Sequence, residues 1–277
     1  MFSSGNVRQT AVAGMFYPQQ AEQLNRMFSD WLPETGTHRS GEVQSRSSIP
    51  RALIVPHAGY VYSGQAAATG YACWQDAADF IKTIVVMGPA HRVGFHGITT
   101  VDFDAVDTPL GALEIDTALR DSILTQFKQV TVSNYAQQHE HSLEVHFPFI
   151  KHLFPEARVL PMLNGNASPE EVKQVLEYLW LQEGVYFVIS SDLSHFHTYE
   201  EARQIDHETA LMITHADWKN LNGERACGYK GIQGLLALKD KFPIDIQQLK
   251  LINSGDTAGD KSRVVGYGTW AIYEEGV

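Results

Sequence analysis

Cysteine is scarce in this chain of 277 residues, which contains only Cys73 and Cys227. Two cysteines form at most one disulfide bond, and a reducing compartment disfavours even that one. Long apolar segments are missing as well, because no run reaches the roughly 18 residues that a membrane span needs. The first residues show no basic stretch followed by an apolar core, so they do not resemble a secretory signal. We therefore expect a cytoplasmic protein that has no membrane as a partner.

Positive charge is also in short supply. The chain has 21 lysines and arginines against 32 aspartates and glutamates, which gives a formal net charge of -11 at pH 7. Such a chain repels phosphate backbones, so nucleic acid is not an expected partner. The short metal motifs CxxC and HExxH are absent, whereas histidine is abundant with 12 residues. A metal site in this chain must therefore be assembled from segments that are far apart in the sequence.

Short apolar runs alternate with helical patterns along most of the chain. Continuous apolar runs are typical of strands that are covered on both faces, and their alternation with helices indicates an α/β fold. A segment at 97–114 alternates apolar and polar residues around turn residues, which predicts antiparallel strands. The polar segment 34–49 predicts a surface loop. We predict a single-domain α/β/α sandwich with a mixed central sheet over residues 1–277. Its strands are expected at 51–55, 83–87, 158–163, 185–190 and 264–272, and its helices at 20–32, 64–77, 142–153, 168–182 and 199–216.

Histidines follow three of the predicted strands. His57 comes after the first strand and His91 after the second, while Asp192 and His195 come after the strand at 185–190. Binding sites of open α/β sheets lie beyond the carboxyl ends of their strands. A single histidine in such a place is more often structural, but three at the same edge of one sheet favour a functional site.

A further imidazole lies in EHSLEVHFPFI, residues 140–150. If this segment is helical, His141 and Glu144 lie three residues apart on one face, which brings an imidazole and a carboxylate together. His146 is then expected to point elsewhere. The alternative is a solvated helix start with acidic residues in its first turn, which the helix dipole favours.

Cys227 stands beside Gly228, just before an apolar helical pattern. The positive end of a helix favours a thiolate, although most free cysteines are small buried hydrophobic residues. Cys73 fits that second interpretation, because it lies inside an apolar helical pattern, and we expect it to be buried and inert. Two imidazoles and a thiolate would give a metal three ligands and leave a position open for water or substrate. Sulfur favours iron, copper or zinc over magnesium.

Seven segments resemble, in order, those of the Memo family, whose prokaryotic members are called AmmeMemoRadiSam system protein B. The resemblance runs across nearly the whole chain. The segments are AGMFYP (13–18), VPHAGYVYSG (55–64), GPAHRV (88–93), EHSLEVHFPF (140–149), SSDLSHF (190–196), ACGYKGI (226–232) and VVGYGTWA (264–271).

The resemblance implies a fold like that of the class III extradiol dioxygenases, which are non-haem iron enzymes. It implies that His57, His91 and Cys227 bind a divalent transition metal, with iron ahead of copper and zinc. Dioxygenases of this fold carry a carboxylate where Memo-like proteins carry the cysteine. The resemblance also implies a set of catalytic polar residues that line the same cleft, namely Asp192, His195 and His141.

Three functions compete at this stage. The first is a metal-dependent redox or oxygenase-like enzyme acting on a small organic substrate. The second is a zinc-type hydrolase in which Asp192 or His195 is the general base. The third is a non-catalytic module that binds a peptide in the same cleft, as the resemblance to peptide-binding eukaryotic relatives implies. A metal-free cysteine–histidine hydrolase is a weaker fourth. The family name further implies association with a radical-SAM protein, and we expect Cys227 to be the redox-sensitive cysteine.

Overall fold

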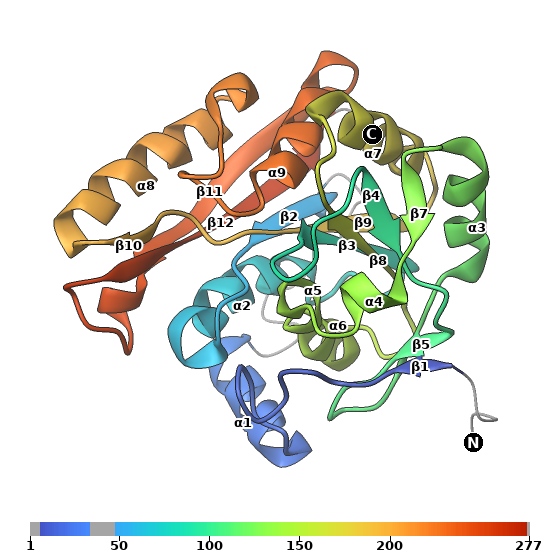
Figure 1. The fold of residues 1–277 in the computed structure, drawn as a ribbon. Coiled ribbons are helices and arrows are strands. Elements are labelled where there is room, and N and C mark those ends of the chain that lie inside the picture. The colour runs from blue at the N-terminus through green and yellow to red at the C-terminus, as the bar shows by residue number, and fades with distance from the viewer. Residues whose placement is uncertain (1–5, 34–47, 276–277) are drawn as a thin grey trace.

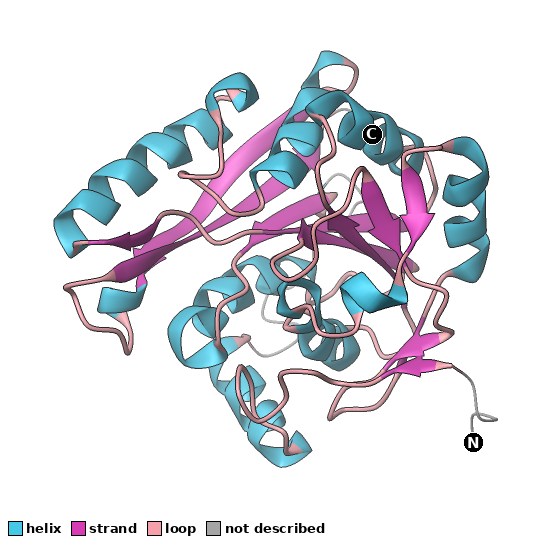
Figure 2. Cartoon of the chain, in the orientation of Figure 1, coloured by secondary structure: helices cyan, strands magenta, loops and turns pink. Residues whose placement is uncertain are grey.

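The computed structural model describes residues 6–33 and 48–275, and its centre is a nine-stranded mixed sheet (Figures 1 and 2). Four neighbouring strands in the middle of this sheet are parallel, so their carboxyl ends lie at one edge. Nearly every residue of these strands is buried, as their continuous apolar sequences predict. In order across the sheet they are β2 (Ala52–Val55), β9 (Val185–Ser190), β3 (Thr83–Pro89) and β8 (Arg158–Asn164).

Antiparallel strands extend the sheet on both sides, which confirms that it is mixed. On one side β12 (Val264–Glu274) lies antiparallel to β2 and pairs with β11 (Ile244–Asn253) and β10 (His195–His197). On the other side β4 (Ile98–Thr100) is antiparallel to β8, and β7 (Val130–Val132) follows it.

Alternate strand residues contact two separate hydrophobic clusters, one on each face of the sheet. In β2, Leu53 and Val55 contribute to one cluster, while Ala52 and Ile54 contribute to the other. The other strands, several loops and the helices supply the remaining residues of both clusters, and the helices cover both faces (Figure 1). The first face carries α1 (Ala21–Trp31), α2 (Gln65–Tyr71), α5 (His141–Glu144) and α6 (Phe147–Leu153), and the second carries α3 (Thr117–Gln126), α7 (Pro169–Trp180), α8 (Tyr199–Thr214) and α9 (Tyr229–Leu236).

The structure departs from the sequence prediction in two segments, and it leaves a third mostly untested. The helix expected at 142–153 is divided into α5 and α6, and Pro148 lies in the first turn of α6, where proline is tolerated. The antiparallel segment at 97–114 contributes to two sheets, because only β4 joins the large one. The rest forms β5 (Ala105–Val106) and β6 (Leu113–Glu114), which make a small sheet with β1 (Val7–Arg8). Most of the loop expected at 34–49 falls outside the described residues.

Two further features concern the helices. Short helical segments flank the parallel strands, among them α4 (Asn134–Gln137) and a π-helical turn at Tyr60–Gly64, close to His57. Within residues 6–33 and 48–275, every helix is too short or too polar to cross a bilayer.

Candidate metal centre

Three potential metal ligands converge at the carboxyl edge of the parallel strands. One ligand atom each from His57, His91 and Cys227 lies within 4.8 Å of the other two. The Cys227 Sγ is 3.4 Å from the His57 Nε2, and the two imidazole rings are 5.2 Å apart, centroid to centroid. The structure therefore brings together all three residues that the sequence predicted as ligands.

The ends of three elements place these side chains. His57 and His91 each stand two residues beyond the end of a parallel strand, β2 and β3, and Cys227 stands two residues before α9. Gly228 allows the cysteine turn to approach the end of β9, because a Cβ atom at this position would lie 2.3 Å from the Ser190 carbonyl oxygen. No side chain fits such a gap, so the glycine is required by space rather than by its backbone angles.

Ser190 fixes the tautomer of His57. The Ser190 hydroxyl donates to the Ser142 carbonyl oxygen at 2.5 Å, and a carbonyl oxygen only accepts. The hydroxyl proton is thereby used, so Ser190 Oγ must accept from its two other neighbours, the His57 Nδ1 at 2.7 Å and the His146 Nε2 at 2.9 Å. Burial and the nearby imidazole of His91 lower the pKa of His57 well below its usual value, so this ring is neutral. Its Nε2 consequently carries the lone pair, and this atom faces Cys227.

Glu140 fixes the tautomer of His91. Its Oε1 lies 2.9 Å from the His91 Nδ1, and its Oε2 accepts from the His91 backbone N–H at 2.6 Å. Burial acts to raise the pKa of Glu140, but the hydrogen bonds and charge of His91 outweigh it, and the pKa falls to about 2. An ionised carboxylate only accepts, so the His91 Nδ1 donates and its Nε2 is left for a metal.

A second set of potential ligands, His91, Glu140 and His141, also lies within bonding reach of a single ion. Its carboxylate is already saturated, because Glu140 Oε1 additionally accepts from the backbone N–H groups of His141 at 2.9 Å and Ser142 at 3.0 Å. These bonds begin α5 and would have to break for Glu140 to bind an ion. The set that contains Cys227 therefore fits a metal better, and its sulfur and two imidazole nitrogens suit a transition metal.

Asp192 stands beside the ligands without contacting the outer nitrogen of either imidazole. Its Oδ1 accepts from the His57 backbone N–H at 2.8 Å, while its Oδ2 is 3.9 Å from the His57 Nε2. The outer nitrogens of the two rings are held by Ser190 and Glu140 instead, and the catalytic role expected of Asp192 stays a prediction. Burial raises the pKa of Asp192 to about 7, against the hydrogen bonds from the backbone of His57 and Ala58. A carboxyl group in this state can accept or release a proton near neutral pH.

The environment of Cys227 differs from the sequence prediction in one respect. Burial, followed by the charge of Asp192, raises the pKa of the Cys227 thiol to about 12. The Asp192 backbone N–H lies 3.3 Å from the sulfur, and this contact alone does not offset the loss of water. The prediction that the start of α9 stabilises a thiolate is thus wrong for the metal-free protein. Cys227 becomes a thiolate only when a metal is bound.

The other two predicted polar residues occupy different places. His141 stacks on His91 with ring centroids 4.7 Å apart, and its Nδ1 is 3.3 Å from Glu140 Oε1. His195 opens β10 and is partly buried, and its protonation would further lower the pKa of His57. Burial lowers the pKa of both His141 and His195, so both are neutral imidazoles near pH 7. Their catalytic roles stay predictions.

Three other expectations for individual side chains are wrong. Glu144 does not partner His141; it is buried and accepts from Arg8, Tyr17 and the backbone of Ala11 and Val12, which anchors the N-terminal segment. His146 does not point away, because it shares Ser190 with His57. Cys73 is partly exposed rather than buried, although burial still raises the pKa of its thiol.

Sequence reasoning missed Glu140 and Ser190, the two residues that hold the imidazoles. Glu140 lies in the segment singled out for Glu144 and caps the start of α5, but the sequence signal for an N-cap is Ser, Thr, Asp or Asn rather than glutamate. Ser190 is the last residue of β9, just before the loop that carries Asp192 and His195. Nothing in its sequence context identifies it as the partner of an imidazole.

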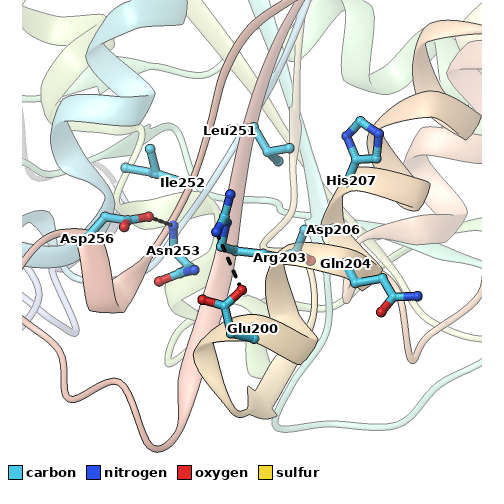
Figure 3. Close-up of a pocket in the computed structure, with 9 residues that line it drawn as sticks. All are labelled: Glu200, Arg203, Gln204, Asp206, His207, Leu251, Ile252, Asn253 and Asp256. Carbon is cyan, nitrogen blue, oxygen red and sulfur yellow. Dashed lines mark hydrogen bonds and ion pairs between the residues drawn. The ribbon is translucent and has the colours of Figure 1, made fainter.

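A separate hollow of about 570 Å³ lies between α8 and β11 (Figure 3). The side chains of Glu200, Arg203 and His207 from α8 face this hollow, with Asn253 and Asp256 across from them. None of the six predicted site residues lines it. Volume alone would therefore point to a different part of the molecule from the converged ligands.

Comparison with known proteins agrees with the resemblance seen in the sequence. The family model described as Memo-like protein matches residues 8–271, a range that includes all six predicted site residues. Proteins described as MEMO1 family protein from Aquifex aeolicus and Methanosarcina mazei are each 34% identical to this chain, over 94% of it and 97% of the relative. A protein of the same description from Sulfurisphaera tokodaii is 30% identical over the same shares. With nearly the whole of both chains aligned, this protein belongs to the Memo family.

Proposed function

We propose that the protein is a metal-dependent enzyme of redox or oxygenase-like type that acts on a small organic substrate. The observation that carries the proposal is the convergence of one ligand atom each from His57, His91 and Cys227, with both imidazole tautomers fixed by buried partners. A thiolate beside two neutral imidazoles favours iron, copper or zinc over harder cations. Iron bound there would supply one-electron chemistry and an open position for substrate.

The chain's own residues have separate tasks in this proposal. Ser190 and Glu140 hold the two rings and keep the lone pairs directed inward. Asp192, whose pKa is about 7, takes or gives a proton at its Oδ2, the oxygen nearest the His57 Nε2. His141 and His195 are neutral imidazoles at the border of the centre and can accept a proton from a bound substrate.

A zinc-dependent hydrolase is the second candidate, and Asp192 is the observation that favours it. A buried carboxyl with a pKa of about 7 is suited to act as general base toward a water molecule. The two candidates share every residue named above and differ in the metal and in the need for oxygen.

The metal content of protein purified without oxygen tests the proposal. We expect about one transition-metal ion per chain, as a three-ligand site requires, and loss of that ion in His57→Ala and Cys227→Ala. His207→Ala removes an imidazole from the hollow of Figure 3 and serves as the matched control, which should keep the metal. Mass spectrometric elemental analysis measures all four proteins.

Oxygen uptake by the iron-loaded protein then separates the candidates. Uptake that depends on a small organic substrate, and that is lost in Cys227→Ala, supports the redox enzyme. Zinc in the purified protein, with ester or amide hydrolysis and no oxygen uptake, supports the hydrolase instead. Metal that stays bound in both ligand variants would reject the centre itself, and a tight peptide complex without turnover would support the binding module.

A further inference from the structure

Phe196, the residue after His195 in β10, has a strained backbone. Its φ is 63°, in the left-handed region, where a Cβ atom crowds the chain and glycine is the usual residue. Among the described residues other than glycine, only Ala216 also has a positive φ. Ala216 lies just beyond α8, where left-handed residues commonly end a helix. Phe196 has no such position, because it lies within a strand.

Burial does not offset the strain at Phe196. The residue is 63% exposed, so its ring gains little from leaving water. The strand register also shifts between His195 and His197, which pair with Val265 and Val264 of β12. A left-handed residue at such a bulge is ordinarily glycine. Phenylalanine therefore stands where the backbone favours glycine, and strained residues of this kind are concentrated at functional sites.

Two neighbours contact the ring of Phe196. The Arg263 guanidinium carbon lies 5.0 Å from the ring centroid, within the range of a cation–π interaction. The His195 imidazole lies 5.7 Å from the ring, centroid to centroid, and the two planes are 68° apart, which is a favoured edge-to-face arrangement. The ring thus connects His195 to Arg263, which directly precedes β12.

The His195 imidazole has little other support. In the part of the chain that the structure describes, Phe196 is the only aromatic ring in contact with it, and the Leu193 backbone is the only hydrogen-bonding group that acts on it. His57 and His91, in contrast, each have a buried hydrogen-bond partner, at 2.7 Å and 2.9 Å. Burial lowers the pKa of His195 most, and a protonated His91 would lower it further, so the two rings lie near each other.

We propose that Phe196 is a positioning residue, whose ring holds the His195 imidazole at the border of the metal centre. Arg263 lies over the ring and steadies it, and the ring in turn limits the rotation of His195. Glycine would relieve the strain but would leave His195 without this contact. The part that His195 plays in a reaction rests on the proposed function, whereas its placement by Phe196 stands on these contacts alone.

Carbon relaxation NMR of labelled histidine rings in the metal-free protein tests the placement. The signal of His195 is identified by its loss in His195→Gln. Phe196→Gly should lower the order parameter of this ring from about 0.85 to below about 0.6, the values that separate rigid from flexible groups. Phe196→Tyr keeps the ring and should retain the order. Phe196→Gly should also unfold at the same or a higher urea concentration than the wild type, because the strain is gone.

Ala216→Gly is the matched control, because it relieves the same kind of strain at the opposite end of α8 from β10. It should leave the order of His195 unchanged. Arg263→Gln removes the cation over the ring without altering the backbone of Phe196, and it should loosen His195 to a smaller extent. This variant decides the matter if Phe196→Gly does not fold. A His195 ring that stays ordered in both variants overturns the proposal, and so does a loss of order in Ala216→Gly.

Paramagnetic shifts in the cobalt-loaded protein distinguish this proposal from the proposed function. We expect the ring signals of His195 to be shifted in the wild type and in Phe196→Tyr, and to approach their unshifted positions in Phe196→Gly. Failure to bind cobalt would contradict the proposed function, and the relaxation measurement would still decide the role of Phe196. Identical cobalt shifts in the wild type and Phe196→Gly would overturn the positioning role even with the metal centre confirmed.

Discussion

The metal centre and the hollow between α8 and β11 differ in how their charged groups are held. In the hollow, Glu200 and Arg203 are 80% and 62% exposed and form an ion pair at 3.5 Å (Figure 3). At the centre, the side chains of His57 and Glu140 are 2% and 1% exposed, and each has a buried partner for its hydrogen bonds. The hollow of about 570 Å³ thus belongs to the region with the weaker constraints.

This difference teaches which observations identify a site. An exposed ion pair contributes about 0–1 kcal/mol and leaves its side chains free to rotate. Buried titratable groups are costly unless their partners are fixed, so their presence together at one strand edge marks a place where the fold maintains a chemical arrangement. The two regions are also joined, because Asp206 at the wall of the hollow accepts from the Ser194 backbone N–H at 3.0 Å and so holds the loop that carries Asp192.

The largest effect is expected for Gly228→Ala. This substitution changes the surroundings of Cys227 and does not alter the lining of the hollow between α8 and β11. The new methyl group would lie 2.3 Å from the Ser190 carbonyl oxygen, so the Cys227 turn must move. We expect metal affinity to fall by at least about 100-fold and the free energy of unfolding by about 1–3 kcal/mol. Metal titration and urea denaturation measure the two effects.

Gly223→Ala is the matched control for this change. A Cβ atom at Gly223 would have its nearest neighbour, the Tyr229 Cε1, at 3.6 Å, which is ordinary contact. The control should bind metal like the wild type. A Gly228→Ala protein with unchanged metal affinity would show that the position of Cys227 is not critical and would place the ligand assignment in question.

The next effect concerns pH and the wall of the hollow. Burial raises the pKa of Asp206 from 3.8 to about 6, so the folded protein favours the protonated carboxyl. The stability that this proton provides is present below about pH 4 and is lost as the pH rises through about 6. Asp206→Asn keeps an acceptor for the Ser194 N–H without the charge. It should raise the free energy of unfolding at pH 7 by at most about 3 kcal/mol.

Urea denaturation between pH 4 and pH 7.5 tests the expected change in slope. The variant should show a smaller decline in stability than the wild type as the pH rises through about 6, because the contribution of Asp206 is removed and that of Asp192 stays. Asp121→Asn serves as the control, because Asp121 is 65% exposed and its pair with Arg120 should contribute little. Equal pH profiles for wild type and Asp206→Asn would mean that Asp206 is solvated and does not brace the loop.

Much of the sheet could be predicted because its signal is local. The apolar runs of β2, β3, β8 and β9 are buried along nearly their whole length, and such runs are distinctive in a sequence. Because β2 and β3 are recognised as parallel strands, His57 and His91, which follow them, are expected at the carboxyl edge of the sheet. β11 was missed because Ile244–Asn253 contains polar residues at alternating and neighbouring positions, and its pairing with β12 over nine residue pairs, not its own sequence, makes it a strand.

The partners of the imidazoles could not be predicted, because they depend on contacts between distant segments. Glu140 and His91 are 49 residues apart in the chain, and Ser190 and His57 are 133 residues apart. The same holds for the pKa of Cys227, where the local sequence favours a thiolate and the burial created by the whole fold outweighs it.

The smallest effect is expected for Ser190→Ala, which removes one hydroxyl and leaves all three ligands in place. Without this acceptor, the His57 Nδ1–H and the His146 Nε2–H lose their partner, and the His57 proton is free to move to Nε2, where it blocks a metal. Metal affinity should fall by roughly 10–100-fold, while Ser190→Thr, which keeps a hydroxyl, should restore it in part. Ser63→Ala removes a buried hydroxyl that bonds only the Ala58 carbonyl oxygen among the described residues, and it serves as the control.

Nitrogen NMR of labelled histidine in the metal-free protein reads the tautomer of His57 directly. A His57 ring that keeps its Nδ1 proton in Ser190→Ala would show that another group orients it, and the contrast between a constrained centre and an unconstrained hollow would then rest on Glu140 alone.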